Sequence, residues 1–159
     1  MHKDTILATI VAELEQEVAT LTAAAQTSFN DATDEESRAE SKYDTRSLET
    51  SYLASGQARL AVEAREALSR FKNLNMKSFK QEDAIALSAF IEVRTDRETN
   101  YYFLGPSSGG LEIRQSDKTI MVITPQSPIG SRLLGKKQGD TVTVTLGRNQ
   151  ERLTIVDVK

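Results

Sequence analysis

The stretch ITPQSPIGSRLLGKKQGDTVTV, residues 123–144, carries the strongest local structural signals in the chain. Ser127 is a favoured N-cap residue, and Pro128 suits the first helical position, where no backbone N–H is needed. Gly135 is the residue type that most often ends a helix. We therefore expect a short helix between Ser127 and Gly135, with Leu133 and Leu134 attaching it to a sheet.

The second part of this stretch is typical of a turn that leads into a strand. Gly139–Asp140 is a turn-forming pair, and the valines that follow alternate with threonines at the period of a strand. The glycines do not form a phosphate-binding loop, because GxxxxGK[ST] is absent and Lys136–Lys137 follow the expected helix. Two interpretations remain, a solvated turn and a docking loop held by a rigid scaffold.

The residues around this stretch predict an antiparallel sheet. Short runs rich in branched and aromatic residues are separated by Asn, Gly, Pro and Asp, as is usual in such sheets. The runs cover residues 85–93, 101–104, 111–113, 119–123, 141–146 and 153–158. We expect residues 77–159 to form a small β-rich domain that contains the short helix.

Towards the N-terminus the apolar period changes to that of helices. Apolar residues recur at alternating spacings of four and three at Leu7, Val11, Leu14, Val18, Leu21 and Ala25, with Ile6 and Ile10 widening the face. The same spacing returns at Leu53, Gln57, Leu60, Ala64, Ala67 and Phe71. Two such seams joined by a short turn predict an antiparallel helical hairpin, a coiled coil, over residues 1–76. Close packing of its arms would explain Gly56. The fold class expected for the chain is α+β.

The expected end of the hairpin, near residues 31–40, is acidic. The first seam runs out near Phe29, and Thr33 with Glu36 forms a capping-box pattern that predicts the start of the second helix. Asp34 and Glu35 would then lie in its first turn, where the helix dipole favours negative charge.

Composition excludes several kinds of chemistry. The chain has no cysteine and a single histidine, His2, so disulfides, thiolate nucleophiles and a Ser-His-Asp triad are not expected. Residues 1–36 carry one lysine against eight acidic residues, which argues against direct wrapping around nucleic acid. No apolar run approaches the roughly 20 residues needed to span a bilayer, and no secretory signal is evident. We expect a cytoplasmic protein without membrane contact.

Residues 126–144 as a whole resemble the C-terminal domain of the bacterial Gre transcript-cleavage factors. The shared pattern is Ser-Pro, a short helix ending in Leu-Leu-Gly-Lys, then Gly-Asp and an alternating valine strand. The segment ESKYDTRSLE also resembles the second hairpin arm of these factors, with Tyr43 on the family's tyrosine. The resemblance implies an N-terminal hairpin and an FKBP-like C-terminal domain.

The resemblance also implies a mechanism. Gre factors bind bacterial RNA polymerase through the C-terminal domain and insert the hairpin into the secondary channel. Acidic residues at its end there help the polymerase's own Mg²⁺ to cleave backtracked RNA. The implied polymerase-binding residues are Gln126, Ser127, Pro128 and Lys136. The factor would hold no metal or cofactor stably, would not be an enzyme itself, and would meet nucleic acid only through the polymerase. We expect a monomer, because the hairpin can bury its own seam.

The acidic end departs from the family's pattern of Asp, two residues, then Glu. Alignment on Tyr43 places Glu36 at the aspartate position and Ala39 at the glutamate position, with Glu40 one residue further on. Asp34 and Glu35 keep this end acidic. Two functions remain open: a cleavage-stimulating elongation factor, and a regulator that occupies the secondary channel without cleavage. An FKBP-like fold also raises prolyl isomerase activity, but no aromatic-lined pocket is evident and a fold alone does not carry a function.

Overall fold

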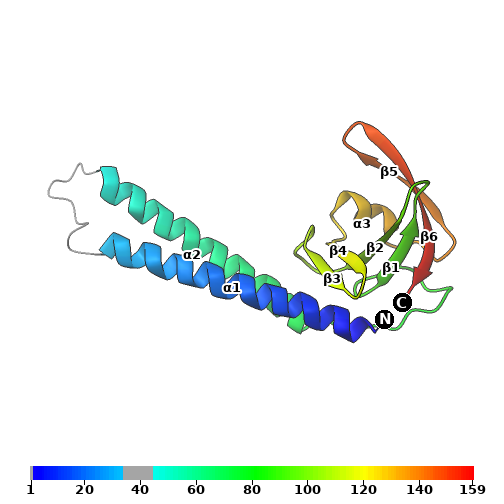
Figure 1. Cartoon of the computed structure of the whole chain (residues 1–159), viewed down its shortest axis with the longest axis horizontal. Helices are drawn as coiled ribbons and strands as arrows, with labels where there is room; N and C mark the ends of the chain where they lie inside the picture. Colours follow the sequence, from blue (N-terminus) through cyan, green and yellow to red (C-terminus); the bar gives the residue numbers. More distant parts are fainter. Residues whose placement is uncertain (1, 34–44) are drawn as a thin grey trace. The chain divides into compact units, whose positions relative to one another are not determined.

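The structure, a computed structural model, describes residues 2–33 and 45–159, with only the backbone described at residues 45–48 and 50. Two long helices, α1 (Lys3–Thr33) and α2 (Thr45–Lys72), precede a β-rich region (Figure 1). That region contains β1 (Phe90–Arg94), β2 (Thr99–Leu104), β3 (Glu112–Gln115), β4 (Lys118–Ile123), α3 (Pro128–Leu133), β5 (Thr141–Leu146) and β6 (Asn149–Val158). The predicted α+β class is confirmed.

The chain forms two compact units. One consists of Val11–Ser69, and the other combines Met1–Ile10 with Arg70–Lys159. The first turns of α1 and the end of α2 therefore belong to the unit that contains the sheet. Within the described residues, neither long helix is apolar enough over a sufficient length to cross a membrane.

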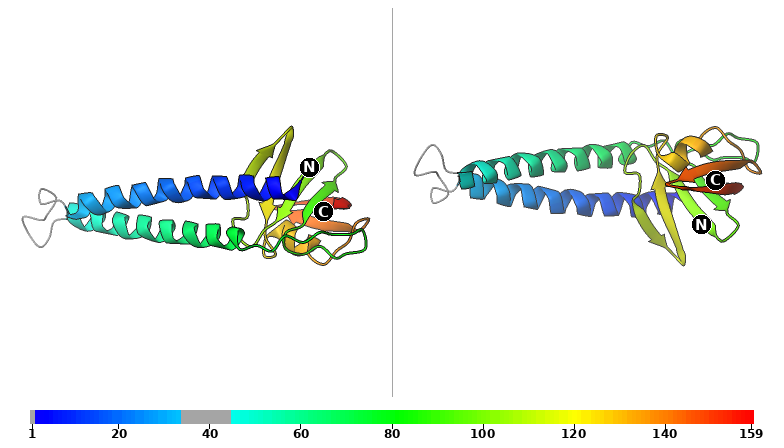
Figure 2. Two further views of the ribbon diagram at one scale, coloured as in Figure 1. Left: turned by 90° about the horizontal axis from the view of Figure 1, so that it is seen from below. Right: turned by 90° about the horizontal axis from the view of Figure 1, so that it is seen from above.

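In the helical unit, α1 and α2 run antiparallel and side by side, as Figures 1 and 2 show from three directions. The seam predicted on α1 is confirmed around Leu14, which is buried. It also continues further than predicted, because Ser28 is buried and the helix reaches Thr33. The sequence pattern missed this last part because serine and alanine add little to an apolar period.

The seam predicted on α2 is partly wrong. Ala64 and Phe71 are buried as predicted, but Leu53 and Leu60 are 55% and 41% exposed. Ala54 and Ala61, which the pattern did not include, are buried in their place. Small side chains at the contact allow two helices to approach closely, since the interaxial distance depends on the residues between them. The alanines therefore face α1, and the leucines next to them turn outward.

Two further expectations for the hairpin are wrong. The Thr33 hydroxyl donates to the carbonyl groups of Phe29 and Asn30, at 3.0 and 3.3 Å, so Thr33 ends α1 rather than capping the second helix. Gly56 is not explained by close packing either, because a Cβ added there would meet nothing within 4 Å.

The six strands form one sheet in the order β3-β4-β2-β1-β6-β5. All neighbours pair antiparallel as predicted except β2 and β4, which pair in parallel, with Tyr102 opposite Met121. The predicted all-antiparallel sheet is corrected at this pair: the chain turns back through β3 and places β4 beside β2 on its return. The segment from β4 to β5 contains α3, which packs beside β5.

Each face of the sheet buries a different set of side chains. One face forms the main core, whose largest fully buried members include Ile91, Leu104, Leu133, Leu153 and Ile155. Phe103, Ile120 and Val122 are also fully buried but lie outside that core. The ring of Phe71, at the end of α2, lies against Gly105 beside Val122.

The first strand starts later than predicted, at Phe90 rather than residue 85. Ser88 is fully buried with φ of 74°, a conformation that a continuous strand cannot contain. Its carbonyl accepts a 2.9 Å hydrogen bond from the Lys3 ammonium, which also donates to the Lys77 carbonyl and lies 4.7 Å from the centre of the Phe79 ring. Burial lowers the pKa of Lys3, while nearby Asp4 opposes that shift.

Candidate functional site

The turn before α3 is organised by the hydroxyl group of Ser127. The Ser127 Oγ accepts hydrogen bonds from the backbone N–H groups of Gly130 and Thr124, at 3.1 and 3.2 Å, and donates to the Thr124 carbonyl at 2.8 Å. Ser127 is the N-cap of α3, and Pro128 occupies its first turn, as predicted. A single side chain therefore joins the end of β4 to the start of α3.

Replacing Ser127 by alanine is expected to lower the free energy of unfolding by about 1–2 kcal/mol, since N-cap serines contribute about that much and the Thr124 N–H also loses its acceptor. Urea unfolding followed by circular dichroism would measure the change. Ser131→Ala is the matched control, because the Ser131 hydroxyl is exposed and its one hydrogen bond among the described residues goes to the Pro128 carbonyl, at 3.2 Å. Equal effects of the two substitutions would contradict the role of Ser127.

The other end of α3 confirms one of the predicted attachments and corrects another. Gly135 has φ of 79°, as a helix-ending glycine should, and its N–H donates to the Ile85 carbonyl at 2.8 Å. Leu133 is fully buried in the main core. Leu134, however, is 43% exposed, because the next residue along a short helix points about 100° away.

An uncharged groove of about 530 Å³ lies beside the start of α3. Its walls come from the β2–β3 connection, the end of β4, the Ser127 turn and the end of β5. The lining residues are Gly109, Gly110, Met121, Val122, Ile123, Thr124, Gln126, Ser127, Pro128, Ile129 and Leu146. The core-packed side chains of Met121 and Ile129 form part of this lining, so the groove is built on rigid elements.

Three of the four residues predicted to bind a partner line this groove. Gln126, Ser127 and Pro128 are brought together there, whereas Lys136 is exposed and does not line it. The Lys136 backbone instead accepts a 2.7 Å hydrogen bond from the Ile85 N–H.

Sequence reasoning missed Met121, Ile129 and Leu146. Leu146 continues the alternation of Val142 and Val144 but is 41% exposed, because β5 extends beyond the core. In the sequence, the signal for a groove residue here was this apolar alternation, which runs on to the last residue of the strand.

The expected turn at Gly139–Asp140 is confirmed. Gly139 has φ of 90°, the Asp140 N–H donates to the Lys137 carbonyl at 3.1 Å, and the Asp140 carboxylate accepts from the Lys137 N–H at 2.9 Å. This turn positions the start of β5 and does not line the groove.

A buried tyrosine of β2, Tyr102, has a raised pKa. Burial raises the pKa of Tyr102, and the nearby carboxylates of Glu151 and Glu98 raise it further. Tyr102 belongs to the main core.

The predicted acidic residues Asp34, Glu35, Glu36 and Glu40 lie outside the described residues. Over residues 2–33 and 45–159, no three His, Cys, Asp or Glu side chains are grouped so that they could hold a metal ion.

The domain that contains the groove matches the model of a known protein family. The family model described as "Transcription elongation factor, GreA/GreB, C-term" matches residues 80–159, half of the chain, and this range includes every groove residue. The chain belongs to the GreA/GreB family. The resemblance of residues 126–144 to Gre factors is thus confirmed.

The comparison with solved structures found several weak similarities. The GreA factor homolog 1 (Gfh1) protein of Thermus thermophilus is 16% identical with a TM-score of 0.39, covering 98% of this chain and 93% of that one. Gfh1 of Thermus aquaticus is 20% identical with a TM-score of 0.39, covering 92% and 89%. The GreA/GreB factor of Nitrosomonas europaea is 21% identical with a TM-score of 0.38, covering 62% and 78%. No curated protein matches the chain.

Proposed function

We propose that this protein binds bacterial RNA polymerase through the groove beside α3 and delivers the acidic end of its hairpin to the polymerase active site. There the acidic residues assist Mg²⁺-dependent cleavage of backtracked RNA. The observation that carries this proposal is that Gln126, Ser127 and Pro128 meet in one uncharged groove within the part of the chain that matches the family.

The chemistry of the groove suits a protein partner. None of its lining residues is charged, and the centres of protein interfaces are depleted in charged residues. The Ser127 hydrogen bonds hold the groove's polar edge in place before binding, so little conformational entropy is lost when a partner docks.

The length of the hairpin supports such delivery. The 31 residues of α1 extend about 45 Å at 1.5 Å per residue. Carboxylates at its end would hold a hard cation and orient the attacking water, while the charge of the metal stabilises the transition state. The polymerase, not this chain, would hold the catalytic Mg²⁺.

One sequence observation favours a second candidate, a regulator that occupies the channel without stimulating cleavage. Alignment on Tyr43 leaves Ala39 where the family has its glutamate, and Glu40 is displaced by one residue, about 100° around a helix. Both candidates use the same docking groove and differ only in the effect of the acidic end.

RNA cleavage by a stalled, backtracked bacterial polymerase with Mg²⁺ separates the two candidates. Faster cleavage that is lost in Glu36→Ala, with binding retained, would support the elongation factor. Tight binding with unchanged or slower cleavage would support the regulator, and the absence of binding would contradict both.

A groove variant tests the docking site in the same assay. Pro128→Glu adds a carboxylate to the uncharged groove at a helix N-terminus, where an acidic residue is compatible with folding. We expect it to weaken polymerase binding roughly thirtyfold, as hot-spot substitutions do. Ser131→Glu adds the same charge on the same helix outside the groove and should bind like the wild type. Equal binding by both variants would move the docking site elsewhere.

A further inference from the structure

The β5–β6 hairpin separates the groove from a second concavity. This one, about 460 Å³, is lined by Asp96, Arg97, Leu146, Arg148, Asn149, Gln150, Glu151 and Arg152. Leu146 is the one residue that appears in the lining of both concavities. The groove side of Leu146 is uncharged, and the lining of the second concavity includes three arginines.

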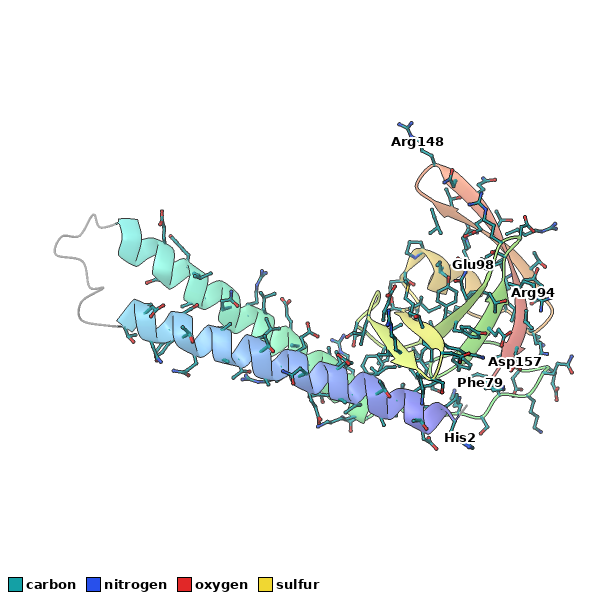
Figure 3. All side chains as sticks on the ribbon, in the orientation of Figure 1. His2, Phe79, Arg94, Glu98, Arg148 and Asp157 are labelled. Carbon is teal, nitrogen blue, oxygen red and sulfur yellow. The ribbon has the colours of Figure 1, made fainter. Side chains whose placement is uncertain are left out.

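The hairpin geometry presents these arginines to solvent. Leu146 pairs with Asn149, so Gly147 and Arg148 form a two-residue turn, and Gly147 has φ of 64°. Glycine at this position is typical of a tight hairpin turn. Arg148 projects from the end of the hairpin away from the sheet (Figure 3). Arg152 lies opposite Thr143, on the solvent face of β6.

The three arginine side chains lack partners within the described part of the chain. Across the described residues, no hydrogen bond or ion pair engages the guanidinium groups of Arg97, Arg148 or Arg152. Each guanidinium group presents a planar set of donors that matches a carboxylate in two parallel hydrogen bonds. Asp96 and Glu151 line the same site, so its net charge is only slightly positive.

We infer that the docking surface extends across Leu146 onto this arginine site, and that the polymerase segment bound there carries apolar side chains followed by carboxylates. This inference rests on the proposed function. Because Leu146 lines both concavities, a single protein segment that crosses this side chain would contact both. A nucleic-acid backbone fits less well, because its binding relies on neutralising several phosphates and Asp96 and Glu151 would repel them.

Binding of the full-length protein to nucleic-acid-free polymerase core tests the inference. The variant Arg148→Ala with Arg152→Ala should bind roughly tenfold more weakly at low salt, mainly through slower association, with a smaller difference at high salt. The matched control, Arg114→Ala with Arg132→Ala, removes the same charge from exposed positions that line neither concavity. It should bind like the wild type.

The alternative outcomes are distinguishable. If Pro128→Glu loses binding but the Arg148/Arg152 variant binds like the wild type, the inference is wrong and the docking groove stands. Binding of the same variants to a single-stranded oligonucleotide is measured in parallel. If the arginine variant loses affinity for the oligonucleotide but not for polymerase core, the partner of the arginine site is nucleic acid and the inference is wrong. If the wild type does not bind polymerase, the proposed function fails, and the inference fails with it.

Discussion

Replacing Gly130 by alanine is expected to destabilise the protein by about 3 kcal/mol, the upper range for a side chain forced into a filled site. A Cβ at Gly130 would lie 1.9 Å from the Thr124 carbonyl oxygen and 2.7 Å from Ser127 Oγ. The Thr124 carbonyl oxygen belongs to the backbone, so it cannot rotate away as the end of a side chain could. The turn must therefore open, and the hydrogen bond from the Gly130 N–H to Ser127 is lost with it.

Urea unfolding followed by circular dichroism measures this effect, and polymerase binding should weaken in parallel because the groove shares the turn. Gly56→Ala is the control, since Gly56 lies inside α2 with open space around it. There alanine should increase stability by up to about 1 kcal/mol, through its better helix propensity. The two glycine substitutions are thus expected to change the free energy of unfolding in opposite directions. A change in the same direction would show that the space around each glycine does not decide the effect.

Phe71→Ala is expected to cost about 3–5 kcal/mol, as the truncation of a fully buried phenylalanine does. Phe71 is 0% exposed, and its ring fits against Gly105 so closely that a Cβ there would lie 2.7 Å from the ring's Cζ atom. Removal of the ring leaves a cavity beside Val122 that the sheet cannot close by shifting.

The same unfolding experiment tests this prediction. Leu53→Ala, at an exposed position of α2, should change stability by less than about 0.5 kcal/mol, because it leaves no cavity. A Phe71→Ala variant as stable as Leu53→Ala would mean that Phe71 does not anchor the end of α2 to the sheet.

The short helix α3 and the strand β5 were predictable because the residues that define them are neighbours in the sequence. The cap of α3 depends on the identities of Ser127, Pro128 and Gly135, and each takes the predicted role. The strand 141–146 was predicted to the residue, because its valines alternate without interruption. The late start of β1 was not predictable in this way, since the conformation of Ser88 belongs to a turn held by Lys3, which is far away in the sequence.

The amino-acid order alone was enough to define two helical arms, a β-rich domain and a capped short helix, because periodicity and capping act over a few residues. The family followed from the resemblance of residues 126–144 to Gre factors. Folding in three dimensions decided which residues line the groove, why Ala61 rather than Leu60 faces α1, and why Leu134 is exposed. It also brought Met121 and Leu146 to the Ser127 turn. These outcomes depend on how closely backbones approach and on how strands are ordered, and no short-range pattern encodes either one.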